Sequence, residues 1–342
     1  MWEIYKFGSV RDIKQSRKVV KMSTRQLKKI YEQIIEEGIQ ADPRGKLVIQ
    51  NHLKKLKEQY QSLPEKEREY FDQETLTNPY DDTRILNGSG DLDIKTSLVG
   101  IDIDTCELLL MDRLNATKKE KIDLAISHHP QGSAFAHFYE VMDMQSDIFQ
   151  GIGIPINIGE QLVEERKREV SRKIHSANHH RATDAARLLS IPFMCCHTPA
   201  DNHASSFLQK LIDQKKPNFV EDIMDILGTI EEYRIAKQQR SGPCILFGKP
   251  ENRAGKIFID MTGGTEGPKD IVDNLLAAGV GTMIGMHMSE EHYKKFQGKN
   301  IHVIVAGHIA SDNLGMNLLL DKIEKRTHLK ILACSGFRRI KR

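Results

Sequence analysis

Three short stretches of the chain place histidine and carboxylate side chains directly after apolar runs. They are SHHP at 127–130, HTPAD at 197–201 and GHIASD at 307–312. Imidazoles and carboxylates are good ligands for divalent zinc, iron, nickel or manganese. These residue types therefore predict metal chemistry. The candidate ligands are His128, His129, Asp201, His308 and Asp312.

Each stretch also has an ordinary structural interpretation when it is taken alone. The adjacent histidines suit a partly buried or surface pair. Asp201 suits the N-cap of a helix expected over 204–214. His308 and Asp312 are spaced i, i+4, which puts them on one face of a helix expected from 311 to about 324. The occurrence of all three stretches in one chain indicates a metal site more specifically than any single stretch does.

An α/β core is expected to position these side chains. The runs 97–103 and 122–127 flank a helix over about 105–114, which forms a β-α-β unit that ends on the paired histidines. Two further apolar runs, 191–196 and 301–306, end on the other two stretches. Ligands of open α/β sheets bind beyond the carboxyl ends of the strands. We expect the three strand ends to meet at one edge of the sheet.

A glycine-rich loop, 262–268, joins a strand over 256–261 to a helix over 269–278. Backbone N–H groups before a helix can hold an anion. The candidate substrate or anion residues are Gly263, Gly264 and Thr265. The loop fits neither common phosphate-binding pattern, so a plain tight turn is the alternative.

Two further histidines are candidates for catalysis or for a supporting role. His287 follows the strand 281–286, and His197 opens the HTPAD stretch. His175 and His179 form a rival metal pair, spaced i, i+4 on a polar helix expected over about 160–190. The arginine and lysine side chains around that pair disfavour a cation, so a solvated helix face is the alternative.

Residues 1–77 predict an all-helical N-terminal extension to the α/β core at 78–342. A first helix is expected from an N-cap at Ser23 to a stop at Gly38. Asp42-Pro43 is expected to start a second helix that ends at Leu63-Pro64, and Glu65–Phe71 a third. Lysine and glutamate are mixed on the outer faces, which indicates a solvated surface.

Composition excludes several classes of protein. The 342 residues carry 50 basic and 47 acidic side chains, a net charge of +3, so nucleic acid is an unlikely partner. No apolar run approaches the ~20 residues of a membrane span. The N-terminus has charges where a signal peptide needs an apolar core. Five cysteines without CxxC spacing fit a reducing compartment, and we expect a cytoplasmic protein.

The three stretches, in this order and with this spacing, resemble the Nif-three-like family over residues 80–342. Members are dinuclear-metal proteins long described as homologues of type 2 GTP cyclohydrolase I. The resemblance implies an α/β fold with mixed sheets flanked by helices. It also implies two divalent ions (Zn, Fe, Mn or Ni) on the five candidate ligands. Asp201 is the expected bridge between them, because a carboxylate offers two oxygens. A toroidal homohexamer with the metals facing its inner cavity is implied too. His197 matches a histidine of the family.

This sequence departs from the family pattern at several points. Asp312 stands where the family usually has glutamate, and one methylene less shortens its reach. The N-terminal arm and the helical insertion at about 160–190 are additional. The regulatory-type domain of longer members is absent, because too few residues separate Asp201 from His308.

These observations predict a metal-dependent hydrolase that acts on a phosphate- or nucleotide-like small molecule through a metal-activated water. The alternative is a non-catalytic metal-binding assembly with a regulatory or scaffold role, in which the helical arm makes contacts. A phosphoesterase with a DHH-type motif is disfavoured, because Ser127 precedes the histidine pair where an acid is required.

Overall fold

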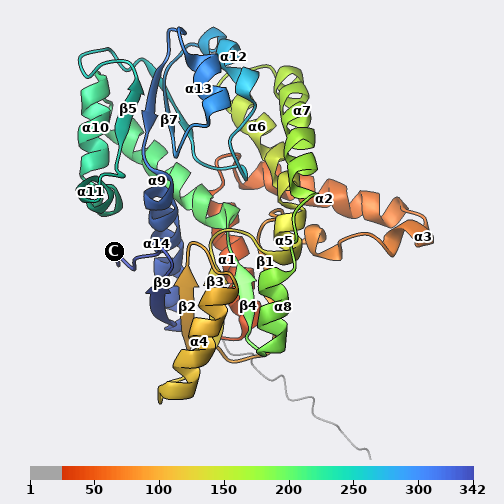
Figure 1. Cartoon of the computed structure of the whole chain (residues 1–342). Helices are drawn as coiled ribbons and strands as arrows, with labels where there is room; N and C mark the ends of the chain where they lie inside the picture. The colour runs from red at the N-terminus through yellow and green to blue at the C-terminus, as the bar shows by residue number, and fades with distance from the viewer. Residues whose placement is uncertain (1–24) are drawn as a thin grey trace, which may run out of the picture.

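Two β-sheets with helices packed around them form the protein (Figure 1). The computed structural model describes residues 25–342. The first sheet has the order β1-β4-β3-β2-β9 and the second has the order β5-β8-β7-β6. In the first sheet the strands are β1 Arg84–Asn87, β2 Thr96–Gly100, β3 Leu124–Ser127, β4 Phe193–Cys195 and β9 Lys330–Cys334. In the second they are β5 Cys244–Phe247, β6 Lys256–Asp260, β7 Val280–Gly285 and β8 His302–Val305.

Both sheets are mixed in the same way. The strands are parallel except for one edge strand: β1 runs antiparallel to β4, and β5 runs antiparallel to β8. This architecture confirms the α/β fold with mixed sheets flanked by helices. The expectation of a single sheet edge was wrong, because β3 and β4 belong to one sheet and β8 to the other. The strand-end side chains are therefore brought together from two sheets.

Helices fill the connections and cover the sheets. The N-terminal half contains α1 Leu27–Ala41, α2 Lys46–Ser62, α3 Glu65–Arg68, α4 Thr105–Thr117, α5 Gly132–Ala136, α6 Met144–Gly151, α7 Ile156–Ile174 and α8 Arg181–Leu188. The C-terminal half contains α9 Thr198–Lys215, α10 Val220–Gly228, α11 Glu231–Gln238, α12 Val272–Ala277, α13 Glu290–Phe296 and α14 His308–Thr327. Short 3₁₀ helices are η1 Gln73–Leu76, η2 Phe138–Asp143 and η3 Lys269–Ile271. No helix among the described residues is long and apolar enough to cross a bilayer.

Two long helices join the sheets and carry the carboxylate ligand candidates. Helix α9 leaves β4 of the first sheet, and α14 runs from β8 of the second sheet back to β9 of the first. Their backbones cross closely at Gly315, where a Cβ atom would lie 2.3 Å from the carbonyl oxygen of Ala200. This close crossing fixes the first turn of each helix relative to the other.

Helix α1 runs through Gly38 instead of stopping there, so the expected helix end was wrong. A Cβ atom at Gly38 would lie 2.8 Å from the Cβ of Pro199 on α9. Glycine is required by close helix packing at this position, and its low helix propensity is overridden by burial. The expected N-cap at Ser23 lies outside the described residues.

Helix α2 begins after Gly45 rather than at Asp42-Pro43, so that expected start was also wrong. The side chain of Asp42 is buried and accepts hydrogen bonds from Arg44 and Tyr80. It is therefore not free to cap a helix. The end of α2 at Leu63-Pro64 agrees with the sequence. Helices α2 and α3 project away from the two sheets (Figure 1).

The single polar helix expected over 160–190 is two helices, α7 and α8, which is a further correction. His175 and His179 lie in the connection, and their rings contact Tyr139 and Phe135, respectively. The Nε2 of His179 lies 2.9 Å from the carbonyl oxygen of Ile174, an acceptor at the end of α7. The helical spacing that suggested a rival metal pair is therefore absent.

Candidate metal centre

His128 and His129 follow β3, and each is held by a hydrogen bond at Nδ1. The Nδ1 of His128 lies 3.1 Å from the carbonyl oxygen of Cys196. A carbonyl only accepts, so Nδ1 donates this hydrogen bond and Nε2 is the nitrogen left to face a cation. The Nδ1 of His129 lies 2.7 Å from a carboxylate oxygen of Asp102, just after β2. Both Nε2 atoms are thereby turned inward, as in metal-binding histidines whose outer nitrogen is anchored.

His197 follows β4 and is held in the same way. Its Nδ1 lies 2.9 Å from Asp82 Oδ2. Asp82 is fully buried and also accepts a hydrogen bond of 2.6 Å from the Thr198 hydroxyl. The hydrogen bonds from His197 and Thr198 outweigh the effect of burial and lower the pKa of the Asp82 carboxyl. The Nε2 of His197 lies 3.7 Å from Asp201 Oδ2. Three imidazoles of the first sheet are thus fixed with one nitrogen facing a common space.

The carboxylates of Asp201 and Asp312 face these imidazoles from the first turn of α9 and the second turn of α14. The Nε2 of His128 lies 3.4 Å from Asp201 Oδ1 and 3.6 Å from Asp312 Oδ1. The other oxygen of Asp312 lies 3.5 Å from His129 Nε2 and 3.6 Å from His308 Nε2. Asp201 therefore belongs to α9 itself, and is not the cap of a helix that starts at 204.

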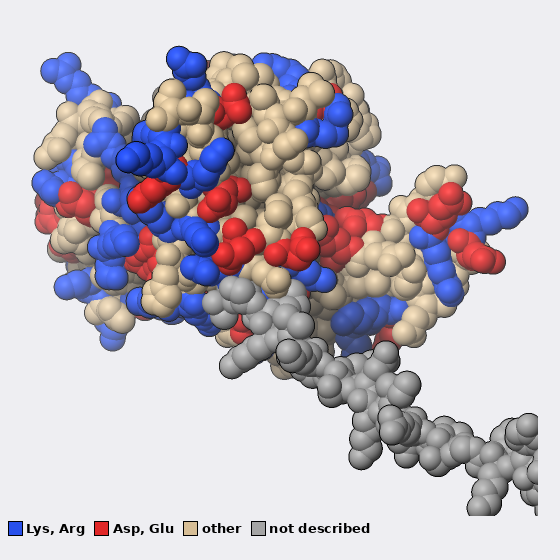
Figure 2. Space-filling view, turned by 90° about the horizontal axis from the view of Figure 1, so that it is seen from below, with Lys and Arg blue, Asp and Glu red and all other residues tan. Residues whose placement is uncertain are grey.

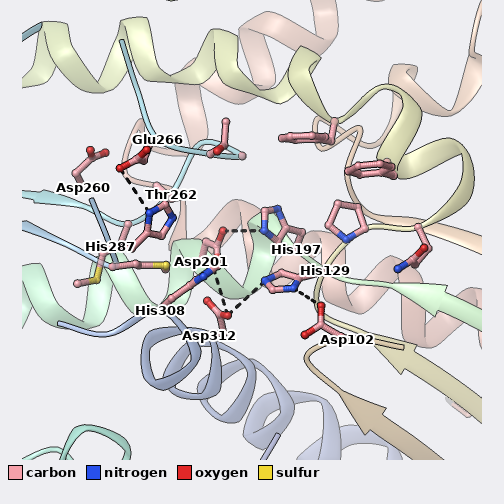
Figure 3. Close-up of a pocket in the computed structure, with 18 residues that line it drawn as sticks. Asp102, His129, His197, Asp201, Asp260, Thr262, Glu266, His287, His308 and Asp312 are labelled. Carbon is pink, nitrogen blue, oxygen red and sulfur yellow. Dashed lines mark hydrogen bonds and ion pairs between the residues drawn. The ribbon is translucent and has the colours of Figure 1, made fainter. Parts of the chain in front are cut away.

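Several of these polar atoms are buried and have no hydrogen-bond partner. They are His128 Nε2, Asp201 Oδ1, and both carboxylate oxygens of Asp312. An unpaired buried polar group is costly, because it loses its water and gains nothing. All four atoms belong to one group of side chains, which we call the His/Asp cluster: His128, His129, His197, Asp201, His308 and Asp312 (Figure 3).

The cluster perturbs the pKa values of its members in opposite directions. Burial raises the pKa of Asp201 well above its usual range. Burial also acts on Asp312, but the surrounding imidazoles, His128 first, hold its pKa below the usual range. Burial lowers the pKa of His308 to about 4. For His129 burial is outweighed by hydrogen bonds to Asp102 and Asp312, which raise the pKa to about 10.

The donor set fits divalent transition metal ions. Three overlapping triads have ligand atoms within 4.8 Å of one another: His128, His129 and His197; His129, His308 and Asp312; and His128, Asp201 and Asp312. Nitrogen and carboxylate donors without thiolate suit zinc, iron, manganese or nickel. The thiol of Cys196 is also buried, and burial raises its pKa well above the usual value, which disfavours a thiolate.

A cavity of about 390 Å³ opens over the cluster. His287 lies in it, with its ring centroid 4.8 Å from that of His308. The Nδ1 of His287 lies 3.5 Å from Glu266 Oε1, and this carboxylate raises the pKa of the imidazole. Figure 3 shows His287 between Glu266 and His308.

The glycine-rich loop borders the same cavity only in part. Gly264 and Thr265 line it and Gly263 does not. The side-chain amide of Gln145 donates to the carbonyl oxygens of Gly263 and Thr265. A Cβ atom at Gly263 would lie 2.7 Å from Gln145 Cγ, so close packing and positive φ account for the glycine. The loop leads into the three-residue η3, and anion binding by this loop stays a prediction.

Sequence reasoning missed Asp82 and Asp102, which orient His197 and His129. Asp82 lies 115 positions before its histidine, and no local pattern joins the two. Asp102 follows β2 directly, so the strand-end rule that selected the other residues could have found it.

Comparison with known proteins found similarity to solved structures. A scan against protein-family models and a search of curated proteins each gave no match. Among solved structures, a NIF3 superfamily protein from Sphaerobacter thermophilus matches with 28% identity and a TM-score of 0.68, over 75% of this chain and 91% of that chain. This likeness supports membership of the NIF3 superfamily.

Two other solved structures match the chain at lower similarity. A Bacillus cereus protein related to NIF3 is 9% identical with a TM-score of 0.41, over 74% of this chain and 91% of that chain. Reduced HcgD from Methanocaldococcus jannaschii is 11% identical with a TM-score of 0.47, over 73% of this chain and 87% of that chain. The match to the Sphaerobacter thermophilus protein confirms the expected fold and supports the Nif-three-like resemblance of the three sequence stretches.

Proposed function

We propose that the chain is a metal-dependent hydrolase that holds two divalent ions on His128, His129, Asp201, His308 and Asp312. The observation that carries the proposal is the set of buried, unpartnered atoms in the His/Asp cluster. Such atoms are expected to be paired in a stable protein, and two bound cations would pair them. The cavity beside the cluster supports a small-molecule substrate.

Asp312 is the better candidate for the residue shared between the two ions, although Asp201 is the expected bridge. Its Oδ1 faces His128 and its Oδ2 faces both His129 and His308. It therefore contacts histidines from both sheets. The missing methylene relative to glutamate does not prevent this reach, because Asp312 lies in the second turn of α14, beside the two histidines that follow β3.

Divalent ions held in this site would supply Lewis acidity and lower the pKa of water at neutral pH. The residues of the chain provide the remaining functions. His128, His129 and His197 are locked with Nε2 facing inward. We assign to His287, supported by Glu266, the role of carrying a proton to or from the substrate across the cavity. His197 is better suited to be a further metal ligand than to move a proton, because Asp82 fixes its Nδ1 and its Nε2 faces the cluster.

The charge of the cavity supports a cation-dependent reaction. Among the described residues that line it there is no lysine or arginine, while five are aspartate or glutamate. A phosphate-like group would be repelled unless divalent ions were present to receive it. We therefore place any anionic part of the substrate at the metals rather than at the 262–268 loop.

The test combines metal analysis with an activity screen. The full chain is purified, its metal content is measured, and a panel of phosphate esters and related compounds is assayed. We expect turnover in the metal-loaded protein and not in His128→Ala or Asp201→Ala. Activity that survives removal of the metal would contradict the mechanism.

A non-catalytic metal-binding assembly is the second candidate, and the projecting arm favours it. Among the 17 residues of α2 only Ile49 is buried, while Leu47 is 69% and Tyr70, beyond α3, is 87% exposed. We propose that this surface takes part in self-assembly, with a homohexamer as the form that the family resemblance implies. Light scattering of Leu47→Ser with Tyr70→Ser tests this, and an unchanged mass would exclude the arm from assembly.

A further inference from the structure

The histidines and Asp201 of the His/Asp cluster are held in different ways. His128, His129 and His197 are each anchored by a hydrogen bond at Nδ1. No described residue forms a hydrogen bond with the carboxylate of Asp201, which lies 3.4 Å from His128 Nε2 and 3.7 Å from His197 Nε2. The position of this carboxylate must therefore be set by the backbone that carries it, the first turn of α9.

Asn202, the next residue, holds this turn. It is fully buried, and both ends of its side-chain amide are bonded. Its Nδ2 donates to the carbonyl oxygen of Gly38 at 3.3 Å and to Asp42 Oδ2 at 3.2 Å. Its Oδ1 accepts a hydrogen bond of 2.7 Å from the Thr262 hydroxyl. A movement of the turn would leave several buried polar groups unpaired, which is costly.

The two acceptors of the Asn202 amide belong to the N-terminal extension. Gly38 lies in α1, and its backbone also packs closely on Pro199 in the first turn of α9. Asp42 follows α1, and its fully buried side chain accepts hydrogen bonds from Arg44 and from the Tyr80 hydroxyl. The extension therefore meets the first turn of α9 both by packing and through a buried polar network.

The donor to Asn202 belongs to the cavity. Thr262 lines it and begins the glycine-rich loop that follows the second-sheet strand β6. Further along this loop, the side-chain amide of Gln145 holds the carbonyl oxygens of Gly263 and Thr265. The bond to Asn202 thus fixes the start of the loop to α9, which follows a strand of the first sheet.

We propose that Asn202 is a positioning residue of the metal site, which holds Asp201 and the glycine-rich loop to the N-terminal extension. Asn202 does not line the cavity, so it acts through Asp201 and Thr262. A metal site needs its ligands held within about 0.5 Å of their productive geometry. The extension is then a part of the metal site, in addition to any contacts that it makes outside the chain. The inference rests on the proposed function in one respect, that Asp201 is a ligand.

Cobalt(II) bound to the full chain tests this role, because its visible absorption depends on the coordination geometry. Asn202→Leu has a similar volume and removes all three bonds. It should lower the affinity for cobalt about tenfold, the low end of what is typical for residues around a ligand set, and shift the absorption bands. Asp42→Asn combined with Arg44→Met removes the buried ion pair as a unit and should act in the same direction.

Two substitutions at Thr262 keep the test open if Asn202→Leu does not fold. Thr262→Val removes the hydroxyl with little change of shape, and it should shift the cobalt bands in the same direction as Asn202→Leu. Thr262→Ser keeps the hydroxyl and should restore the spectrum of the parent protein. A difference between valine and serine at this position reports the hydrogen bond to Asn202.

Asn115→Leu is the matched control for loss of stability. Asn115 lies in α4, and its side-chain amide donates to the carbonyl oxygen of Ile122 and accepts from the backbone N–H of Ile122. This substitution also removes partly buried hydrogen bonds of an asparagine, but it does so away from the His/Asp cluster. We expect a lower melting temperature, with the cobalt affinity and spectrum of the parent protein.

Hydrogen exchange of the metal-free protein gives a readout that does not depend on any ion. Asn202→Leu should raise amide exchange in residues 198–203 and 262–268 together, because both segments lose the same anchor. Thr262→Val should raise it mainly in 262–268. Asn115→Leu should raise it in neither segment.

The outcomes separate this inference from the proposed function. It is overturned if Asn202→Leu and Thr262→Val keep the exchange rates and the cobalt spectrum of the parent, or if Asn115→Leu shifts the spectrum equally. If the parent binds no metal but exchange rises as expected, Asn202 still holds the turn and the loop to the extension, and the hydrolase proposal fails. If the protein is a metal-dependent hydrolase and neither readout changes, the reverse holds.

Discussion

The histidines contributed by the two sheets are held very differently. His128, His129 and His197 follow strands of the first sheet, and a carbonyl or carboxylate fixes the Nδ1 of each. His308 follows β8 of the second sheet, and no described residue forms a hydrogen bond with its Nδ1. Its side chain is 42% exposed, whereas that of His128 is completely buried.

This difference suggests that the two ions would be bound with unequal strength. An anchored imidazole loses less rotamer freedom on binding and keeps the correct tautomer. An ion held mainly by first-sheet residues should therefore bind tightly, and an ion that depends on His308 should bind weakly. Substitutions of the ligands and of the residues that anchor them can test this contrast between the two ions.

Asp312→Asn should have the largest effect, because its carboxylate faces histidines of both sheets. We expect loss of both ions, with affinities lowered by more than the roughly 10–100-fold typical of changes outside the ligand set. Metal content after dialysis and titration calorimetry measure it. If the Asp312→Asn protein still retained two ions, Asp312 would not be the carboxylate that the two ions share.

His308→Ala should remove one ion and leave the other. The tight ion keeps its first-sheet ligands, so titration should show one site instead of two, with the remaining affinity changed less than about threefold, or ~0.7 kcal/mol. His302→Ala, in the strand that leads to the same site, is the control and should keep both. Loss of both ions in His308→Ala would show that the two halves are not separable.

The anchoring residues should have intermediate effects, and Asp82 should matter more than Asp102. Replacing either by asparagine should lower metal affinity about 10–100-fold. Asp82 is fully buried and the side chain of Asp102 is 61% exposed, so solvent screens the bond of Asp102 to His129. Competition titrations with a chelator give the two affinities. Equal or reversed effects would contradict the role assigned to burial.

Metal binding should release protons, and the affinity should rise with pH between 6 and 8. Burial raises the pKa of Asp201, and hydrogen bonds to Asp102 and Asp312, which outweigh burial, raise that of His129 to about 10. Both groups hold a proton that a cation must displace, so metal binding becomes weaker as the pH is lowered. Calorimetry in buffers of different ionisation enthalpy counts the protons. A pH-independent affinity without proton release would mean that neither group is a ligand.

The sequence allowed the ligand candidates to be found because each is a local feature. A histidine or aspartate directly after an apolar run needs no knowledge of which strands pair. The arrangement in two sheets was not predictable in this way, since the pairing of β3 with β4 and of β7 with β8 depends on contacts between distant residues. Strands β5 and β9 and helices α10 and α11 were not anticipated either.

Glycines and long-range polar contacts account for most of the remaining errors. Gly38 indicated a helix end by propensity, but it is the contact point of α1 with Pro199. Asp42 indicated a helix start, but it is used in a buried network with Arg44, Tyr80 and Asn202. The composition of 50 basic and 47 acidic residues indicated a surface of mixed charge. Figure 2 shows acidic and basic side chains interspersed over the face seen from below.

The most direct test of the account is anomalous diffraction from crystals of the protein loaded with zinc or manganese. We expect two anomalous peaks in the His/Asp cluster, one on each side of the Asp312 carboxylate. When the metal is limiting, the peak beside His308 should be the weaker of the two. Absence of both peaks from a fully loaded protein, or peaks only at other sites, would contradict it.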